Sequence, residues 1–362
     1  MRPSVVEVDL RAIRHNAATL AEAVAPAQLC AVVKADGYGH GDVPVAEAAV
    51  DGGATWLAVA LVEEGVRLRE AGIEAPILVL SEPALDDAAA IVHWRLTPTA
   101  YRTEFVEALD ATGAPISVHV KVDTGMHRVG ADTATAIEVA AAVSNAVNLR
   151  LGGLWTHFAV AEDDAEFTKR QTEDLIAVAS RLKGAGMPPD MLHAANSAGA
   201  LGYPQARLDM VRCGIALYGL RPGPGFDVDL QPAMTVKSKV SFTKRLPASA
   251  RPSYGRVRPL LAESTVATVP IGYADGLARR LGVTGGEALI GGKRHAFAGT
   301  VTMDHIVVDC GDDQVSVGDE VVVLGRQGDE EITADEWATR LETINYEVVC
   351  DFGPRLPRRY LT

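Results

Sequence analysis

The stretch Leu29-Cys30-Ala31-Val32-Val33-Lys34-Ala35-Asp36-Gly37-Tyr38-Gly39-His40-Gly41 is the most informative part of this chain. Its first five residues are apolar and predict a short strand that is buried on both faces. A glycine-rich turn follows at once, so the strand delivers Lys34 to its carboxyl end. Burial there would lower the pKa of the amine, which suits attack on a carbonyl or a Schiff base. The alternative is a structural lysine that ends a strand and extends its ammonium to water.

Short apolar runs and amphipathic helical stretches alternate from about residue 10 to residue 220. Helical spacing is clear in segments such as 62–71, 131–147 and 164–182. The predicted strands are 29–33, 56–59, 76–80, 95–97, 116–122, 150–157, 191–195 and 209–218. Eight β-then-α units that close on themselves predict an α/β fold, a (β/α)8 TIM-type barrel, over residues 10–232.

The residue pattern of the chain changes after Pro232. Runs rich in β-branched residues, separated by Gly, Asp and Arg, replace the long helices, and they lie at 236–242, 264–269, 306–309 and 320–324. This pattern predicts a second, mainly antiparallel β domain over 233–362, together with residues 1–9. One helix interrupts it, with Thr333 as N-cap and Leu341 near its end. The Pro/Gly cluster at 221–225 is expected to be a surface loop near the boundary.

Composition excludes several classes of protein. The chain has 362 residues, and its net charge of −13 argues against a nucleic-acid partner and an anionic membrane surface. No apolar run is long enough to span a bilayer, and the charged N-terminus lacks a signal-peptide pattern. The four cysteines are scattered with no disulfide or zinc spacing, which leads us to expect a cytoplasmic protein without a metal site. Walker A, GxGxxG, HExxH and GxSxG sequences are absent.

The most distinctive polar side chains fall where the predicted barrel strands end, which is where barrel chemistry gathers. They are Lys34, Tyr38, Lys121, Asp123, Arg128, His157, Asn196, Ser197 and Arg212. Lysines, arginines and a histidine at one end of a barrel favour an anionic ligand with a reactive carbonyl, and pyridoxal phosphate is the obvious candidate.

Each of these residues also has a structural interpretation. His157 fits a hydrogen-bonded core histidine, and Arg212 fits a buried ion pair with Asp209. Ser197 fits the N-cap of the next helix, a position that is compatible with phosphate binding. The amides of Gly214 and Ile215, in a strand-to-loop turn, are a weak signal for a phosphate site.

Six motifs in order make the chain resemble the alanine racemases, which are pyridoxal-phosphate enzymes that interconvert L- and D-alanine. They are VVKADGYGHG at 32–41, KVDTGMHRVG at 121–130, RCGIALYG at 212–219, IGYADG at 271–276, GTVTMD at 299–304 and INYE at 344–347. The likeness extends from Val6 to Tyr360. It implies a homodimer with shared active sites and a role in supplying D-alanine for peptidoglycan.

The resemblance also implies a role for each matching residue. Lys34 would carry the cofactor and act as one of two bases, and Tyr273 would be the other base, reaching the site from the partner subunit. The phosphate would be held by Tyr38, Ser197, Gly214, Ile215 and Tyr346. Arg212 would face the pyridine nitrogen, with His157 beside the ring. Arg128 and Met303 would contact the substrate, and Lys121 matches a lysine that is often carbamylated in this family and would orient Arg128.

Racemisation explains why two bases are needed. A proton leaves one face of a planar carbanion and another arrives on the opposite face, so bases on both sides are the simple solution. Two departures from the family pattern, Thr302 and His305, lie near the expected pocket entrance and leave the substrate range open.

Two other functions remain as alternatives. One is a pyridoxal-phosphate amino-acid decarboxylase of the same architecture, although Cys310-Gly311-Asp312-Asp313 lacks the pattern of the catalytic cysteine in those enzymes. The other is a non-catalytic pyridoxal-phosphate carrier, which is typically a lone barrel.

Overall fold

The computed structural model describes residues 2–223, 225–226 and 228–362, so Pro224 of the predicted 221–225 loop lies outside the described residues. The chain divides into two compact units. One, the barrel unit, comprises Arg11–Gly37 and Asp42–Gln231. The other, the β unit, comprises the N-terminal segment through Leu10, the short piece Tyr38–Gly41 and Pro232–Thr362.

The barrel unit contains the predicted eight-stranded parallel sheet, in the order β8-β7-β6-β5-β4-β3-β2-β9. Its strands are β2 (Gln28–Val32), β3 (Trp56–Val59), β4 (Ile77–Val79), β5 (Thr97–Ala100), β6 (Ile116–Lys121), β7 (Leu149–Trp155), β8 (Leu192–His193) and β9 (Met210–Cys213). The backbone N–H of Asp209 donates to Leu192 O at 3.0 Å, and that of Arg212 donates to Ala195 O at 2.9 Å. These bonds join β9 to β8 and close the sheet. The (β/α)8 barrel is therefore confirmed.

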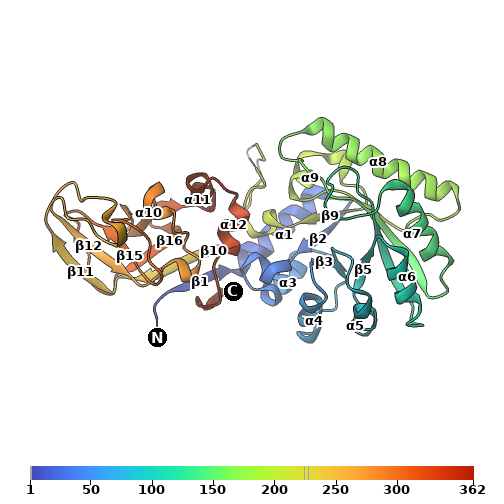
Figure 1. Ribbon diagram of the computed structural model, residues 1–362, viewed down its shortest axis with the longest axis horizontal. Coiled ribbons are helices and arrows are strands. Elements are labelled where there is room, and N and C mark those ends of the chain that lie inside the picture. The colour runs from blue at the N-terminus through green and yellow to red at the C-terminus, as the bar shows by residue number, and fades with distance from the viewer. Residues whose placement is uncertain (1, 224, 227) are drawn as a thin grey trace. The chain divides into compact units, whose positions relative to one another are not determined.

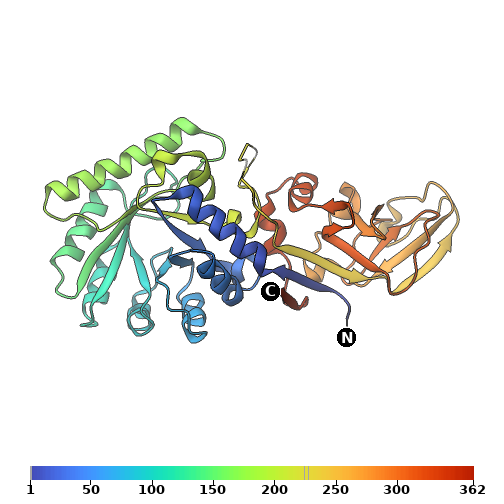
Figure 2. The same ribbon diagram turned by 180° about the vertical axis from the view of Figure 1, so that it is seen from behind.

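Helices surround this sheet (Figures 1 and 2). They are α1 (Leu10–Val24), α3 (Asp42–Asp51), α4 (Val62–Glu70), α5 (Ala88–His93), α6 (Thr103–Asp110), α7 (Thr133–Asn145), α8 (Ala165–Gly184) and α9 (Ser197–Gly202), with the short turn α2 (Lys34–Tyr38) after β2. Helix α1 buries an apolar stripe at helical spacing that includes Ile13, Ala17 and Leu20. Strands β2, β3 and β4 are almost entirely buried, which is why they read as apolar runs in the sequence.

Two predicted strands differ from the observed ones for backbone reasons. The strand expected at 95–97 begins instead at Thr97, because Arg95 has a φ of +51° and Leu96 N–H still bonds to Ile91 O at the end of α5. The run at 209–218 is extended only as far as Cys213. Gly214 has φ −99° and ψ −92°, and Ile215–Tyr218 forms a 3-10 turn.

The β unit contains two sheets of mainly antiparallel strands. The larger has the order β14-β13-β16-β10-β1-β18, with β17 beside β16, and the smaller has the order β11-β12-β15. Their strands are β1 (Val5–Asp9), β10 (Met234–Lys239), β11 (Phe242–Leu246), β12 (Ser264–Val269), β13 (Glu287–Ile290), β14 (Lys293–Ala296), β15 (Ile306–Asp309), β16 (Glu320–Gln327), β17 (Glu330–Ile332) and β18 (Arg358–Leu361). The predicted run at 236–242 therefore spans two strands.

Strand β1 lies between β10, to which it is antiparallel, and β18, to which it is parallel, so both chain ends enter this sheet. The unit's helices are α10 (Leu281–Thr284), α11 (Ala334–Leu341) and α12 (Asn345–Cys350). The predicted cap of α11 is confirmed, because the Thr333 hydroxyl accepts from Glu336 N–H at 3.1 Å.

Candidate active site

The predicted residues of the barrel unit gather at the carboxyl ends of its strands. Lys34 follows β2, Lys121 ends β6, and Arg212 lies in β9. His157 follows β7, and its pKa is lowered well below the usual range by burial and by four cations, Arg212, Lys121, Arg128 and Lys34. The structure thus brings these residues into one electropositive cluster.

Lys34 opens a turn of left-handed backbone. The φ values of Ala35, Asp36, Gly37 and Tyr38 lie between +51° and +59°. Only glycine adopts this region without cost, so the three other residues are held there by their surroundings. The sequence predicted a glycine-rich turn at this place but not its hand.

Glu64 of α4 clamps this turn, a role that the sequence analysis missed. Its side chain is buried, and one carboxylate oxygen accepts from Ala35 N–H at 2.7 Å. The other oxygen accepts from Ala60 N–H at 2.8 Å and Leu61 N–H at 3.1 Å, at the start of α4. The signal was its third position in the first turn of a helix, where a glutamate reaches back to the cap.

Arg212 belongs to this cluster and is 2% exposed. Its guanidinium donates to His193 Nδ1 at 2.8 Å and to His157 Nδ1 at 3.2 Å. It also donates to the backbone oxygens of Thr156 at 2.8 Å and Ala194 at 2.9 Å, while its Nε has no hydrogen-bond partner among the described residues.

The sequence suggested an ion pair of Arg212 with Asp209 as an alternative, but both residues have other partners in the structure. Asp209 Oδ2 accepts from the backbone N–H of Leu192 at 2.7 Å, between β9 and β8. Arg212 instead donates its hydrogen bonds to neutral acceptors, and its burial lowers the pKa of the guanidinium to about 10, which leaves it charged at neutral pH.

The contacts of Arg212 fix the tautomers of three histidines. An arginine only donates, so the Nδ1 atoms of His193 and His157 accept and the ring protons lie on Nε2. His193 Nε2 then donates to His119 Nδ1, which is 3.0 Å away. Burial, with the charge of Arg212, lowers the pKa of His193 and lowers that of His119 to about 3, so both rings are neutral. The sequence analysis missed both residues, although His119 shares a strand face with Lys121 at a spacing of two.

Lys121 is buried beside Trp155. Its Nζ lies 4.2 Å from the centre of the indole ring, and the same ring lies 4.5 Å from the Arg212 Cζ. Burial and repulsion from Arg212 and Arg128 lower the pKa of Lys121 to about 7. A substantial fraction of this amine is therefore neutral at physiological pH.

Asp123 shapes the turn between Lys121 and Arg128. One of its carboxylate oxygens accepts the amides of Gly125, Met126 and His127 at 2.9–3.0 Å. Burial alone would raise the pKa of Asp123, but these hydrogen bonds and the charge of His127 lower it overall.

Ser197 does not cap α9, contrary to the alternative interpretation of the sequence. Asn196 is the N-cap, and its Oδ1 accepts from Gly199 N–H at 2.9 Å. The Ser197 hydroxyl instead accepts from Gly214 N–H at 3.0 Å and from Ala216 N–H at 3.4 Å. This hydroxyl still has its own proton to donate, and it lies next to the turn that carries the Gly214 and Ile215 amides.

The other predicted residues lie in the β unit, in two pairs. The rings of Tyr38 and Tyr346 are 6.3 Å apart between centres, and burial raises the pKa of Tyr38. Tyr273 and Met303 lie on adjacent loops, because Tyr273 N–H donates to Thr302 O at 2.9 Å and Ala274 N–H donates to Met303 O at 3.1 Å. Both side chains are strongly exposed, Tyr273 at 41% and Met303 at 52%.

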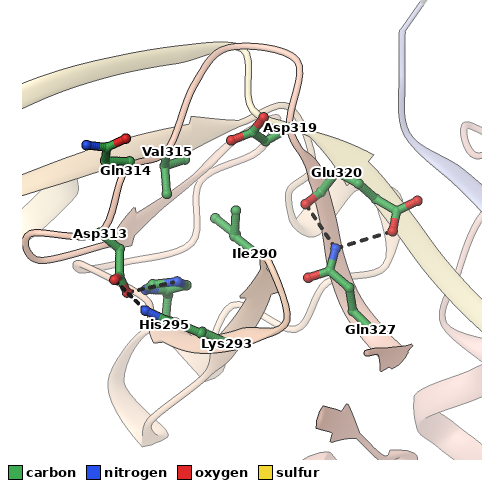
Figure 3. Close-up of a pocket in the computed structure, with 10 residues that line it drawn as sticks. Ile290, Lys293, His295, Asp313, Gln314, Val315, Asp319, Glu320 and Gln327 are labelled. Atoms are coloured by element: carbon green, nitrogen blue, oxygen red, sulfur yellow. Dashed lines mark hydrogen bonds and ion pairs between the residues drawn. The ribbon is translucent and has the colours of Figure 1, made fainter. Parts of the chain in front are cut away.

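A pocket of about 460 Å³ in the β unit involves none of the predicted residues (Figure 3). Its polar side chains largely pair with one another: Lys293 binds Asp313 at 2.6 Å, and Gln327 donates to Glu320 at 3.2 Å. Within the described residues, no group of three or more His, Cys, Asp or Glu side chains is arranged to hold a metal ion. Over the same residues, no helix has the length and apolar character needed to cross a membrane.

Comparisons with known proteins cover nearly the whole chain. Residues 8–222 match the family model for the alanine racemase N-terminal domain, and residues 233–360 match the model for the C-terminal domain. An alanine racemase of Symbiobacterium thermophilum is 45% identical over 368 residues, which cover 99% of this chain and 97% of the relative.

Solved structures give the same result. The crystal structure of alanine racemase from E. faecalis has a TM-score of 0.93 and 37% identity, covering 99% of this chain and 98% of that one. A histidine racemase from Leuconostoc mesenteroides has a TM-score of 0.90 and 29% identity, covering 100% and 98%. The two family models, the full-length relative and the shared fold lead to one conclusion: this chain belongs to the alanine racemase family.

Proposed function

We propose that this protein interconverts L-alanine and D-alanine with pyridoxal phosphate as its cofactor, and that Lys34 and Tyr273 are its two bases. The observation that carries the proposal is the position of Lys34. It stands at the carboxyl end of a barrel strand, within a cluster of positive charge that includes Arg212, Lys121 and Arg128. Such a cluster favours an anionic ligand, and the amine suits a carbonyl. The D-alanine formed would supply peptidoglycan synthesis.

The residues present fit pyridoxal phosphate. Ser197 has a hydroxyl proton to donate, and the neighbouring turn carries the Gly214 and Ile215 amides, which are donors of the kind that bind phosphate. The Gly214 N–H donates to Ser197 Oγ at 3.0 Å, so it would have to share its proton with the phosphate or exchange one acceptor for the other. Tyr38 and Tyr346 add two phenols that we assign to the same phosphate. The buried Arg212 Nε, which has no hydrogen-bond partner among the described side chains and backbone groups, is a donor that needs an acceptor. We assign it to the pyridine nitrogen, with His157 beside the ring.

When bound, pyridoxal phosphate withdraws electrons from the amino acid and acidifies its α-proton. Arg212 would moderate this effect, because a guanidinium that remains charged can only donate and so would keep the pyridine nitrogen unprotonated. With less electron withdrawal, return of a proton to the α-carbon would be favoured over transamination.

The two bases would act on opposite faces of the substrate. Lys34 serves one face from the barrel, and Tyr273 serves the other from the β unit of a second copy of the chain. The tautomer of His157 supports this assignment, because its Nδ1 accepts from Arg212 and its Nε2–H is left to donate. A hydrogen bond from Nε2–H to the Tyr273 oxygen would stabilise the phenolate and so lower the pKa of this base.

Arg128 and Met303 would bind the substrate, with Arg128 near its carboxylate. We propose that Lys121 orients Arg128 after carbamylation. Its neutral amine adds to carbon dioxide, forms an N–C bond and releases one proton to solvent, which leaves a negative carbamate. The lowered pKa of Lys121 supports this step because only the neutral amine reacts.

A racemisation assay tests the proposal. Purified protein reconstituted with pyridoxal phosphate should abolish the optical rotation of L-alanine, and chromatography on a chiral column should show both enantiomers. Release of carbon dioxide would identify a decarboxylase instead, and visible absorption by bound cofactor without turnover would identify a carrier. Serine belongs in the same assay because the sequence leaves the substrate range open. Histidine belongs there because one structural relative is named a histidine racemase.

The homodimer has a separate test, because shared sites allow complementation. Lys34→Ala and Tyr273→Phe variants should each be inactive, whereas unfolding and refolding them together should restore about a quarter of the wild-type activity, in hybrids that contain one intact site. Activity that stays absent would show that both bases come from one chain. We also propose the cytoplasm as the compartment, to which the buried thiols of Cys30, Cys213 and Cys310 are suited.

A further inference from the structure

The turn that carries Tyr273 is built around a buried carboxylate. Asp275 is the last residue of the 3-10 turn Tyr273–Asp275, and its side chain is completely buried. Arg2 binds it in a bidentate fashion, with Nη1 2.6 Å from Oδ1 and Nη2 2.5 Å from Oδ2. The Arg355 Nε lies 3.3 Å from Oδ1, and Gly272 N–H donates to Oδ2 at 2.9 Å. The carboxylate therefore holds both ends of the turn and links it to two distant arginines.

The backbone of this turn is closely packed against neighbouring loops. A Cβ atom on Gly272 would lie 2.3 Å from Thr302 O, and one on Gly276 would lie 2.3 Å from Asp351 O. Asp275 N–H donates to Gly272 O at 3.0 Å, and Gly276 N–H donates to Tyr273 O at 3.2 Å. The Tyr273 side chain, by contrast, is 41% exposed. Because the phenol itself is partly exposed, its position depends on the turn beneath it.

Arg2 ties the turn to its neighbours. Besides Asp275, the guanidinium donates to Pro270 O at 3.0 Å and to Asp304 O at 3.3 Å. Asp304 follows Met303, and its side chain binds Arg355 at 2.7 Å. One ion-pair cluster, consisting of Arg2, Asp275, Asp304 and Arg355, therefore spans the loop of Tyr273 and the loop of Met303.

We propose that Asp275, held by Arg2, is a positioning residue that sets where the Tyr273 hydroxyl stands. This inference rests on the proposed function, because it takes Tyr273 as one of the two bases. Asp275 does not touch the reacting atoms. It acts through the turn, since a fully buried carboxylate that loses its charge can no longer satisfy two arginines and an amide together.

Proton exchange separates this role from a general loss of structure. Racemisation needs both bases, whereas washout of the α-deuterium of one enantiomer needs only the base on its own face. In Asp275→Asn we expect racemisation to fall about 100-fold, the effect of a small misplacement of a reacting group. Washout from the enantiomer that Lys34 serves should fall by less than about tenfold, because that base is untouched. Tyr273→Phe identifies which enantiomer this is.

Glu336→Gln is the matched control. Glu336 also binds two arginines in the β unit, Arg294 at 2.8 Å and Arg340 at 2.6 Å, and its side chain is 25% exposed. This variant loses a comparable ion-pair cluster, and both racemisation and washout should stay at wild-type rates. If Asp275→Asn fails to fold, Arg2→Lys replaces it, because a lysine keeps the charge but loses the bidentate contact. It should show the same selective loss of racemisation at smaller size.

Two results would overturn the inference. One is an Asp275→Asn protein that racemises within about threefold of wild type, since misplacing a base costs far more. The other is an equal fall in racemisation and in washout from both enantiomers, which would indicate a structural role only. A fully active Tyr273→Phe would instead refute the proposed second base, so that failure of the proposed function is distinguishable from failure of this inference.

Discussion

Replacing Glu64 by glutamine should release the left-handed turn after Lys34 while the protein stays folded. Three non-glycine residues of this turn, Ala35, Asp36 and Tyr38, have positive φ values. At roughly 1–2 kcal/mol each, they store roughly 3–6 kcal/mol of backbone strain. Glu64 opposes this strain through Ala35 N–H at 2.7 Å, while its other oxygen binds the two amides at the start of α4.

A glutamine at position 64 has one acceptor oxygen where the carboxylate has two. Its NH2 group must therefore face either Ala35 N–H or the amides of Ala60 and Leu61. Leaving one such buried donor unsatisfied costs about 1–3 kcal/mol, which is well below the total stability of a domain. If the turn relaxes, Lys34 moves, and a displacement of about 1 Å is enough to lower the racemisation rate about 100-fold.

Urea titrations and racemisation rates of Glu64→Gln test this reasoning, with Glu63→Gln as the control. Glu63 lies in the same first turn of α4 but is exposed, so its replacement should change neither quantity. A Glu64→Gln protein with full activity and an unchanged midpoint in urea would show that the turn does not need its clamp. Lower stability with full activity would show that Lys34 is positioned by other contacts.

Three more changes test the cluster around Arg212. In bicarbonate-free buffer, the free energy of unfolding should rise between pH 7 and 10.5, because over this range Lys121 binds a proton in the unfolded chain but not in the folded protein. Urea titrations at several pH values measure this rise, and Lys121→Met should remove it. Arg212→Glu should lower racemisation and produce pyruvate from alanine, detected with a coupled dehydrogenase; full racemisation without pyruvate would contradict the role given to Arg212. Ser197→Ala should weaken binding of pyridoxal phosphate about tenfold in absorbance titrations, whereas the exposed Ser180→Ala should not.

The barrel could be predicted because each strand is a local signal. Every predicted run overlaps an observed strand, and Trp56–Val59 has the predicted bounds. The ends were wrong where one backbone conformation overrode the apolar pattern, as at Arg95, which has a positive φ, and at Gly214. The sequence also allowed us to predict which side chains lie at the carboxyl ends of strands, and Lys34, Lys121 and Arg212 do lie in one cluster.

The residues that support the site could not be predicted in this way, because their partners are remote in the sequence. Arg2 and Asp275 are 273 positions apart, and His119 and His193 are 74 positions apart. No sequence motif links the two members of either pair. An arginine near the N-terminus or a histidine in an apolar strand can have many structural roles, so neither residue by itself indicates its partner. Their roles appear only when the register of the sheets brings them into contact. The proposed supply of the second base by another copy of the chain likewise has no local pattern in the sequence.

The two proposed bases share one physical arrangement, which makes their supports separable by experiment. Lys34 and Tyr273 each stand on a tight turn whose amide is held by a buried carboxylate, Glu64 in one case and Asp275 in the other. Each carboxylate acts on one base only, so each should affect exchange on one face of the substrate. Glu64→Gln should therefore spare α-deuterium washout from the enantiomer that Tyr273 serves, and Asp275→Asn should spare washout from the other. If both variants spare the same enantiomer, the carboxylates do not act through the turns, because two supports on opposite faces cannot produce the same selectivity.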